Sequence, residues 1–347
     1  MNKKINYRLP AEWEKHKSTI LGWPHQKEDW PGKFTPIPWV YTEIVKNIAP
    51  GELVRIIVQS PKDEMKARKL LTRAHVDLTR VQFIVKETDR GWLRDSSPAF
   101  VRNGKETTAI QFTFNGWAKY GNHRKDQEIP TVVADHLGLP LTQVLHNGKP
   151  VVLEGGAIDG NGCGTLLTTE ECLMDNRIQV RNYGFTKSDY ETVFREYFGV
   201  TNVIWLGQGI EGDDTHGHVD DICRFVNRNT VVACKETDRK DKNSRHLAEN
   251  LERLQGARLE NGDALNVVTI PMPKRLNFED LRLPASYVNF MIIKGTVLVP
   301  TFNDRRDYEA LGIFTELFPD RDVIGISAID LIWGLGTLHC LSHEIPA

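Results

Sequence analysis

The chain has no excess of either charge and no long apolar stretch. Its 347 residues include 44 Lys and Arg against 46 Asp and Glu, a formal net charge of −2. Bulk charge therefore gives no reason to expect nucleic acid or an anionic membrane as a partner. No run of about 18 apolar residues is present, which excludes a conventional membrane-spanning helix. The first residues are basic without a following apolar stretch, so we expect no secretory signal.

Cysteine is scarce, and low-complexity sequence is absent. The five cysteines form an odd set without paired spacing, which argues against a disulfide framework. A reducing cytoplasm is therefore the expected location. No linker-like segment divides the chain, so we expect one domain over residues 1–347. The composition, 40% hydrophobic and 26% charged, is that of an ordinary globular protein.

What the chain does contain is an alternation of strand and helix patterns. Short apolar runs predict strands at residues 18–23, 53–58, 81–85, 203–206, 230–234, 267–270, 296–300 and 322–326. Helical spacing and end signals predict helices at residues 38–49, 61–74, 188–198, 243–254 and 307–318. The expected fold class is therefore α/β.

Polar residues whose side chains could take part in catalysis or binding recur along this alternation. Asp95, Glu154 and His218 are spaced by about 60 residues, and the gap from His218 to Cys340 is about twice as long. A repeating unit of about 60 residues would give five or six units in this length.

Two of these positions place a carboxylate beside a predicted strand. Asp95 lies in a short loop with Trp92 and Arg94, where it could meet a cationic ligand with Trp92 as an aromatic wall. The alternative is a surface turn held by an Arg94–Asp95 ion pair. Glu154 follows the apolar run 151–153 and precedes two glycines, a pattern typical of a cleft edge or of a solvated strand end.

The segment 213–221 is dense in titratable residues. If 217–225 is a strand, His218 and Asp220 share one face and can act as proton carrier and charge partner. The alternating spacing of His216, His218 and Asp220 also suits a zinc or manganese site. A solvated acidic loop is the third interpretation.

Cys340 is the candidate nucleophile, and two glycines stand shortly before it. Its neighbour His339 is not expected to be its base, because adjacent strand residues face opposite ways. His218 is the natural base, and a buried core cysteine is the alternative. Cys223 and Cys234 lie in apolar strand patterns and are expected in the core.

Together these residues form an unusual set for proteolysis or acyl transfer, which need at most one acid to orient the histidine. Several carboxylates around a thiol raise its pKa unless the ligand itself is positively charged. A guanidinium is planar, permanently charged and pairs with carboxylates, so it would favour the thiolate. The set therefore predicts a guanidinium ligand attacked by the thiol.

The motifs also resemble those of a known family, the agmatine deiminases and bacterial peptidyl-arginine deiminases. The likeness runs in order over nearly the whole chain, at residues 21–24, 92–98, 114–117, 154–156, 217–220, 283–290 and 336–340. It implies the guanidine-modifying pentein fold, a five-bladed pseudo-symmetric α/β propeller of ββαβ-type units. Five blades would explain the repeat of about 60 residues.

The resemblance also assigns roles. Cys340 matches the nucleophile, His218 the general acid/base, Asp95 and Asp220 the guanidinium-binding carboxylates, and Glu154 the acid beside the histidine. It implies neither metal nor cofactor. Two departures concern the substrate: residues 341–346 replace a stretch that is commonly rich in Gln, and Leu335 stands between two glycines.

The expected reaction is hydrolysis of agmatine to N-carbamoylputrescine and ammonia through an S-alkylthiouronium on Cys340, in putrescine synthesis. Glu28, Asp29 and Trp30 are candidates to receive the distal amine, unless they form a solvated loop. Alternatives are free, methylated or peptidyl arginine as substrate, a metal hydrolase, or a non-catalytic guanidinium binder. A homo-oligomer is compatible with each.

Overall fold

The structure, a computed structural model, describes residues 7–347. The expectation that the chain begins without a secretory signal concerns mainly residues 1–6, which lie outside the described residues.

The described chain contains five consecutive groups of strands and helices. The first comprises β1 (His16–Gly22), α1 (Ile37–Ile48), β2 (Leu53–Val58), α2 (Pro61–Arg73) and β3 (Val81–Val85). The second comprises α3 (Leu93–Ser96), β4 (Ala99–Asn103), β5 (Glu106–Gln111), α4 (Ile129–Leu137) and β6 (Leu141–Gln143). The third comprises β9 (Asp159–Gly160), β10 (Thr165–Thr169), α5 (Glu170–Met174), α6 (Lys187–Phe198) and β11 (Asn202–Leu206).

The last two groups are built in the same way. The fourth comprises β12 (Cys223–Asn227), β13 (Thr230–Lys235), α7 (Lys242–Gly256) and β14 (Asn266–Pro271). The fifth comprises β17 (Met291–Ile293), β18 (Thr296–Thr301), α8 (Arg306–Leu317) and β19 (Asp322–Ser327), and β20 (Ser342–Pro346) follows. Two small hairpins complete the strands: β7 (Leu145–His146) with β8 (Lys149–Pro150), and β15 (Asn277–Phe278) with β16 (Leu281–Arg282).

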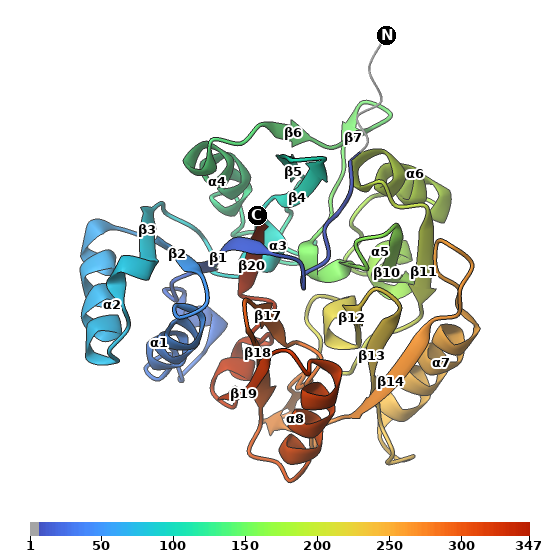
Figure 1. Cartoon of the computed structure of the whole chain (residues 1–347). Coiled ribbons are helices and arrows are strands. Elements are labelled where there is room, and N and C mark those ends of the chain that lie inside the picture. Colours follow the sequence, from blue (N-terminus) through green and yellow to red (C-terminus); the bar gives the residue numbers. More distant parts are fainter. Residues whose placement is uncertain (1–6) are drawn as a thin grey trace.

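Each group forms one blade of a ring. Within the described residues, five sheets of three or four strands have the orders β20-β1-β2-β3, β4-β5-β6, β9-β10-β11, β12-β13-β14 and β17-β18-β19. In every blade the first strand is antiparallel to the second, and a helical crossover connects the second to a parallel third strand. Figure 1 shows the blades arranged in a ring with the helices on the outside. This is the predicted five-bladed α/β propeller with ββαβ-type units.

The ring is closed by its last strand. β20 pairs antiparallel with β1, with Glu344 opposite Thr19, and so supplies the inner strand of the first blade. Figure 1 shows the C-terminus near the middle of the ring. Ile345 of β20 is 1% exposed and packs in an apolar cluster with Ile20 and Phe100, which joins the first blade to the second.

Local signals explain where the helices begin and end. The Ser60 side chain accepts a hydrogen bond from the Asp63 N–H at the start of α2. Thr186 and Asp189 form a capping box on α6, which ends at Gly199 in the left-handed conformation (φ 67°) that glycine adopts without strain. None of the helices between residues 7 and 347 combines the length and hydrophobicity needed to cross a bilayer.

The strands and helices predicted from apolar runs and helical spacing all correspond to elements of the structure, while other elements, among them β4, β5, α4 and β10, lie outside the predicted ranges. The predicted strand at residues 151–153 is wrong: only an isolated bridge joins Val152 to Thr113. The Asn182 side chain takes the place of a neighbouring strand, because it accepts from the Val152 N–H at 2.9 Å and donates to the Val152 carbonyl at 2.7 Å.

The strand considered at residues 217–225 is also wrong in its first half. A short 3₁₀ helix, Val219–Asp221, stands there, and β12 begins only at Cys223. The Asp213 carboxylate accepts the N–H groups of Gly217 and His218 at 2.7 and 2.9 Å, which bends the backbone into a turn. The loop expected around Asp95 is likewise a single helical turn, α3.

Substitution of Ile345 tests whether β20 holds the ring closed. Ile345→Ala should lower the free energy of unfolding by about 3 kcal/mol, the usual effect of removing a buried aliphatic side chain. Chemical denaturation measures it. Ile178→Ala is the control, because this side chain is 58% exposed, and should change stability by less than about 0.5 kcal/mol. Equal effects of the two substitutions would show that β20 does not hold the ring closed.

Candidate active site

Five segments, each leading into the first strand of a blade, bring polar side chains together at the centre of the ring. They precede β4, β9, β12, β17 and β20. Their side chains are Asp95, Glu154, the pair His218 and Asp220, Asn289, and Cys340. The repeat predicted from the sequence is therefore the repeat of the blades. Asn289 lies within the interval from His218 to Cys340, which is about twice as long as the others because it spans two blades.

The predicted residues lie close to one another and are buried. His218 Nδ1 is 3.9 Å from Asp95 Oδ1 and 4.0 Å from Asp220 Oδ1, and His218 Nε2 is 4.0 Å from Glu154 Oε2. The Cys340 thiol lies 3.7 Å from Asp220 Oδ2, to which it can donate. Each of the five side chains has at most 8% of its residue surface exposed.

Three buried atoms in this cluster have no hydrogen-bond partner among the described residues: Glu154 Oε2, His218 Nε2 and Asp220 Oδ1. Buried polar atoms are rarely left unpaired, because each costs about 1–3 kcal/mol. Gly156 leaves room beside one of them, Asp220 Oδ1. A Cβ atom there would lie 2.6 Å from His218 Nδ1, 3.0 Å from Asp95 Oδ1 and 3.2 Å from Asp220 Oδ1. The site thus has the shape and polarity for a small ligand that donates several hydrogen bonds.

The two aspartates differ in their partners. Asp95 accepts from the Trp117 indole N–H at 2.8 Å and from the Gly156 N–H at 2.9 Å. Burial, with the Glu154 carboxylate second, raises the pKa of Asp95 to about 7. Burial and then the Asp95 charge raise the pKa of Asp220 well above its ordinary value. A cationic ligand between the two would favour their ionised forms.

Glu154 is held by an arginine that the sequence did not indicate. Arg181 Nε donates to Glu154 Oε1 at 2.9 Å, and both side chains are fully buried. Burial, and then the charge of Arg181, lower the pKa of His218 well below its ordinary value. The lowered pKa favours neutral His218 at pH 7, the form that can accept a proton.

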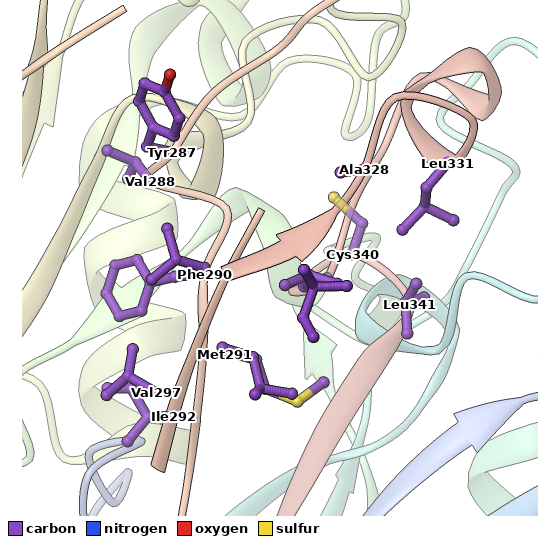
Figure 2. Close-up of a cluster of buried hydrophobic side chains, with 14 of the residues drawn as sticks. Tyr287, Val288, Phe290, Met291, Ile292, Val297, Ala328, Leu331, Cys340 and Leu341 are labelled. Carbon is purple, nitrogen blue, oxygen red and sulfur yellow. The ribbon is translucent and has the colours of Figure 1, made fainter. Parts of the chain in front are cut away.

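Cys340 occupies a tight turn just before β20, not a strand. Figure 2 shows it at the edge of a buried apolar cluster, near Ala328, Leu331 and Leu341. Burial, followed by the charges of Asp220 and Asp221, raises the pKa of the thiol well above its ordinary value. This is the effect of surrounding carboxylates that the sequence predicted.

Asn289 holds the turn that carries the thiol. Its side-chain carbonyl accepts from Thr337 Oγ1 at 2.8 Å and from the His339 N–H at 3.1 Å. Its amide group donates to Cys340 Sγ at 3.1 Å and to Asp220 Oδ2 at 3.2 Å. One side chain thus sets the position of the sulfur relative to the carboxylate.

Arg94 lies behind the site and does not pair with Asp95, so the surface-turn alternative is wrong. Its guanidinium is 2.8 Å from Glu344 Oε2, and its backbone N–H donates to the Cys340 carbonyl at 3.1 Å. Arg94 therefore links α3 to the final strand.

A cavity of about 780 Å³ leads to the thiol. Its inner part is lined by Trp92, Asp95, Trp117, Gly336 and Cys340. Its lining also includes several acidic residues: Glu28, Asp29, Asp214, Glu279 and Asp280. The cavity therefore offers an aromatic wall and an acidic lining to a cation.

The three candidates for the distal amine are placed differently. Trp30 does not line the cavity, since it is 2% exposed and lies against Trp92, with ring centroids 5.4 Å apart. Asp29 lines it, but its carboxylate is bound by Arg90 and by the Trp92 indole N–H at 3.1 Å. Glu28 lines the cavity, is exposed, and forms no ion pair within residues 7–347.

The metal-site alternative is not supported by the positions of its residues. His216 Nε2 is 2.8 Å from Asp175 Oδ2, and its Nδ1 is 3.8 Å from Glu171 Oε1. Among the described residues, the groups that come close enough to share a metal ion do not include His216. His216 and His218 therefore flank the turn at Gly217 and do not point to a shared metal ion.

Comparison with known proteins places this site in a family. A profile of Porphyromonas-type peptidyl-arginine deiminase matches residues 8–346. The agmatine deiminase of Stutzerimonas stutzeri strain A1501 is 32% identical over 366 aligned residues, covering 98% of this chain and 96% of that protein. The chain belongs to the Porphyromonas-type peptidyl-arginine deiminase family. This confirms the resemblance inferred from the motifs.

Solved structures agree with this membership. The agmatine deiminase of Enterococcus faecalis superposes with a TM-score of 0.90 at 26% identity, covering 98% of this chain and 96% of that one. The amidinotransferase SxtG of Microseira wollei shares the fold alone, with a TM-score of 0.52 at 12% identity, over 97% and 96% of the two chains. The fold is thus the pentein fold of this family and of amidinotransferases.

The family motifs found most of the site, and the structure adds three residues to it. Cys340, His218, Asp95, Asp220 and Glu154 converge, while their catalytic roles stay predictions. Trp117 and Asn289 stood inside the quoted motifs without a role, and the double interval before Cys340 was the signal for Asn289. Arg181 has no motif around it that could have revealed its pairing with Glu154.

The raised pKa of Cys340 can be measured by alkylation with iodoacetamide, read by mass spectrometry. The pKa is raised, so the unreactive thiol dominates at pH 7 and thiolate forms only as pH increases. The Cys340 rate should rise about tenfold per pH unit between pH 7 and 9. Cys163, which is exposed, provides the comparison in the same sample. A Cys340 rate at pH 7 equal to that of Cys163 would contradict the raised pKa.

Proposed function

We propose that this chain is a thiol hydrolase that converts agmatine and water to N-carbamoylputrescine and ammonia. One observation carries the proposal: Asp220 Oδ1, which is buried without a partner among the described residues, lies with Asp95 Oδ1 beside Gly156, and the Cys340 thiol is 3.7 Å from the other oxygen of Asp220. A guanidinium has several N–H donors in one plane and a permanent charge, which match such a space. The family membership and the relatives named agmatine deiminase support the same substrate.

Binding begins with the two aspartates. Asp220 Oδ1 and the Asp95 carboxylate would each accept N–H groups of the guanidinium and keep its central carbon fixed. The pKa of both carboxyl groups is raised in the empty site, and the arriving cation favours their ionised forms. The same charge favours the Cys340 thiolate, so the nucleophile forms only when the substrate is present.

The chemistry then takes two steps. The Cys340 thiol first gives its proton to neutral His218, and the thiolate bonds to the guanidinium carbon. One C–N bond then breaks, and His218 passes that proton to the departing ammonia, which leaves an S-alkylthiouronium on Cys340. His218 next takes a proton from water as its oxygen attacks the same carbon, and the C–S bond breaks to release the ureido product. Glu154, held by Arg181, lies 4.0 Å from His218 Nε2 and stabilises the histidine whenever it carries the proton within either step.

The cavity favours a substrate with a second positive charge. Agmatine carries a primary amine at the end opposite its guanidinium, whereas a peptidyl arginine has neutral amides there. The cavity lining includes Glu28, Asp214, Glu279 and Asp280. Asp214 is already bound by Lys119 and by the Tyr120 hydroxyl, so we assign the amine to Glu28, from the predicted set, with Glu279 and Asp280 of the same cavity lining.

The proposal extends to the cellular setting. All five cysteines are free, including the exposed Cys163, which suits a reducing cytoplasm. The product, N-carbamoylputrescine, needs only removal of its carbamoyl group to give putrescine, so the reaction fits putrescine synthesis.

The direct test is turnover and trapping with agmatine. Cys340→Ala should lower ammonia release more than about a thousandfold, because the covalent route is lost. Cys163→Ala, an exposed cysteine in a turn, should keep the full rate. Mass spectrometry after brief exposure to agmatine should find an adduct on Cys340.

A substrate panel completes this test. Agmatine should be used more efficiently, by kcat/KM, than free arginine, methylated arginine or an arginine peptide. Undiminished turnover by Cys340→Ala would refute the mechanism, and a preference for another member of the panel would refute the substrate.

The assignment of the distal amine is tested by Glu28→Gln. We expect KM for agmatine to rise about two- to fivefold with kcat unchanged, the equivalent of one exposed ion pair. Steady-state kinetics measures both values. Glu43→Gln, an exposed substitution on α1 outside the cavity lining, is the matched control. If Glu28→Gln behaves like this control, the amine is received elsewhere.

A further inference from the structure

His339, the residue before the nucleophile, lies between two carboxylates. Its Nδ1 is 2.7 Å from Asp220 Oδ2, and its Nε2 is 3.0 Å from Glu12 Oε2. The ring is 2% exposed. It is absent from the lining of the substrate cavity and borders a second cavity of about 70 Å³ together with Glu12. The imidazole therefore lies behind the substrate cavity, in contact with Asp220.

Both short contacts need a hydrogen. A neutral imidazole carries only one N–H, and an ionised carboxylate carries none. Either His339 is protonated on both nitrogens, or one of the two carboxyl groups is protonated. A neutral histidine between two ionised carboxylates would have one hydrogen for the two contacts. The group of Asp220, His339 and Glu12 therefore holds one more proton than that.

The surroundings of Glu12 place that extra proton on the Asp220 side of the His339 imidazole. Glu12 Oε2 also accepts from the Arg224 guanidinium, and Glu12 Oε1 accepts from the Ile292 N–H at 2.8 Å. Arg94 lies 4.0 Å away. Because donors already point at both of its oxygens, Glu12 is the acceptor in its contact with His339. Nε2 therefore carries a hydrogen, and the extra proton is shared between Asp220 Oδ2 and His339 Nδ1.

The groups around His339 decide where the proton rests in the empty site. Arg224 and Arg94 disfavour an imidazolium, as does His343, whereas Glu344 favours it. Burial, followed by Arg224 and Arg94, lowers the pKa of His339 well below its ordinary value. Since the pKa of Asp220 is raised, the proton rests on Asp220 until a cation arrives.

We propose that His339 is a positioning residue that takes the proton of Asp220 when the guanidinium binds. The Asp220 O–H bond breaks and a His339 Nδ1–H bond forms over the 2.7 Å contact. The ionised carboxylate then faces the substrate, and the imidazolium is held between two carboxylates. No proton has to leave a site whose entrance the substrate fills. The inference rests on the proposed function, because it needs a guanidinium ligand.

The test counts protons released when agmatine binds. Cys340→Ala protein, which cannot turn over, is titrated with agmatine by calorimetry in buffers of different ionisation enthalpy. Adding His339→Asn keeps an N–H donor for Asp220 but removes the proton acceptor. We expect this double variant to release about one proton more per agmatine bound. Its affinity should fall about tenfold per pH unit below the raised pKa of Asp220, whereas the single variant should respond less.

The control is His16→Asn in the same Cys340→Ala protein. His16 is another buried histidine beside a carboxylate, with Nδ1 3.3 Å from Glu52 Oε2, and should leave the proton count unchanged. A merely structural role of His339 would weaken binding equally at every pH and leave the count unchanged, which would overturn the inference. Absence of any agmatine binding by Cys340→Ala would overturn the proposed function, and the inference with it.

A second measurement does not depend on the folding of the His339 variant. In Cys340→Ala/His218→Gln protein with ¹⁵N-labelled histidine, agmatine should convert one buried imidazole from the neutral to the doubly protonated form. Nitrogen chemical shifts report this directly. A spectrum in which no histidine changes its protonation would refute the transfer.

Discussion

The constraint on which the molecule depends is the removal of three carboxylates from water, two of them without a directly paired guanidinium. Asp95, Glu154 and Asp220 are at most 5% exposed, and only Glu154 is paired directly with a guanidinium, that of Arg181. Burial of this kind raises the pKa of a carboxyl group and leaves it ready to respond to a cation. In the proposed reaction the charge of the substrate favours the ionised forms of Asp95 and Asp220, and the same charge activates an otherwise inert thiol selectively.

A second layer of contacts keeps these groups in place. Trp117 and the Gly156 N–H fix Asp95, while Asn289 fixes both the Cys340 turn and Asp220. Behind them, Arg94 and Arg224 bring compensating positive charge to the axis of the ring. Each of these partners comes from a different part of the chain. The ring arrangement is therefore what lets one small space be surrounded by side chains from every blade.

The sequence predicts the fold and the converging residues because both leave short-range patterns. Strand and helix signals found one or more elements in most blades, and polar residues after them showed the repeat. Other features depend on contacts between distant residues and leave no pattern. Asn182 replaces a strand partner for Val152, Asp213 bends the chain before His218, and Arg181 finds Glu154 only in the folded ring. Trp30 looked like part of a binding loop, but its bulk fills the space behind Trp92.

The pairing of β20 with β1 joins segments from the two ends of the described chain. Synthesis proceeds at about 5–20 residues per second, so β1 waits for its partner for on the order of half a minute. During that time the first blade has an open sheet edge, the kind of surface that other chains can pair with. Cys340 reaches the other site residues only with that final strand. An unfinished chain therefore holds the carboxylates but lacks the nucleophile of the proposed reaction.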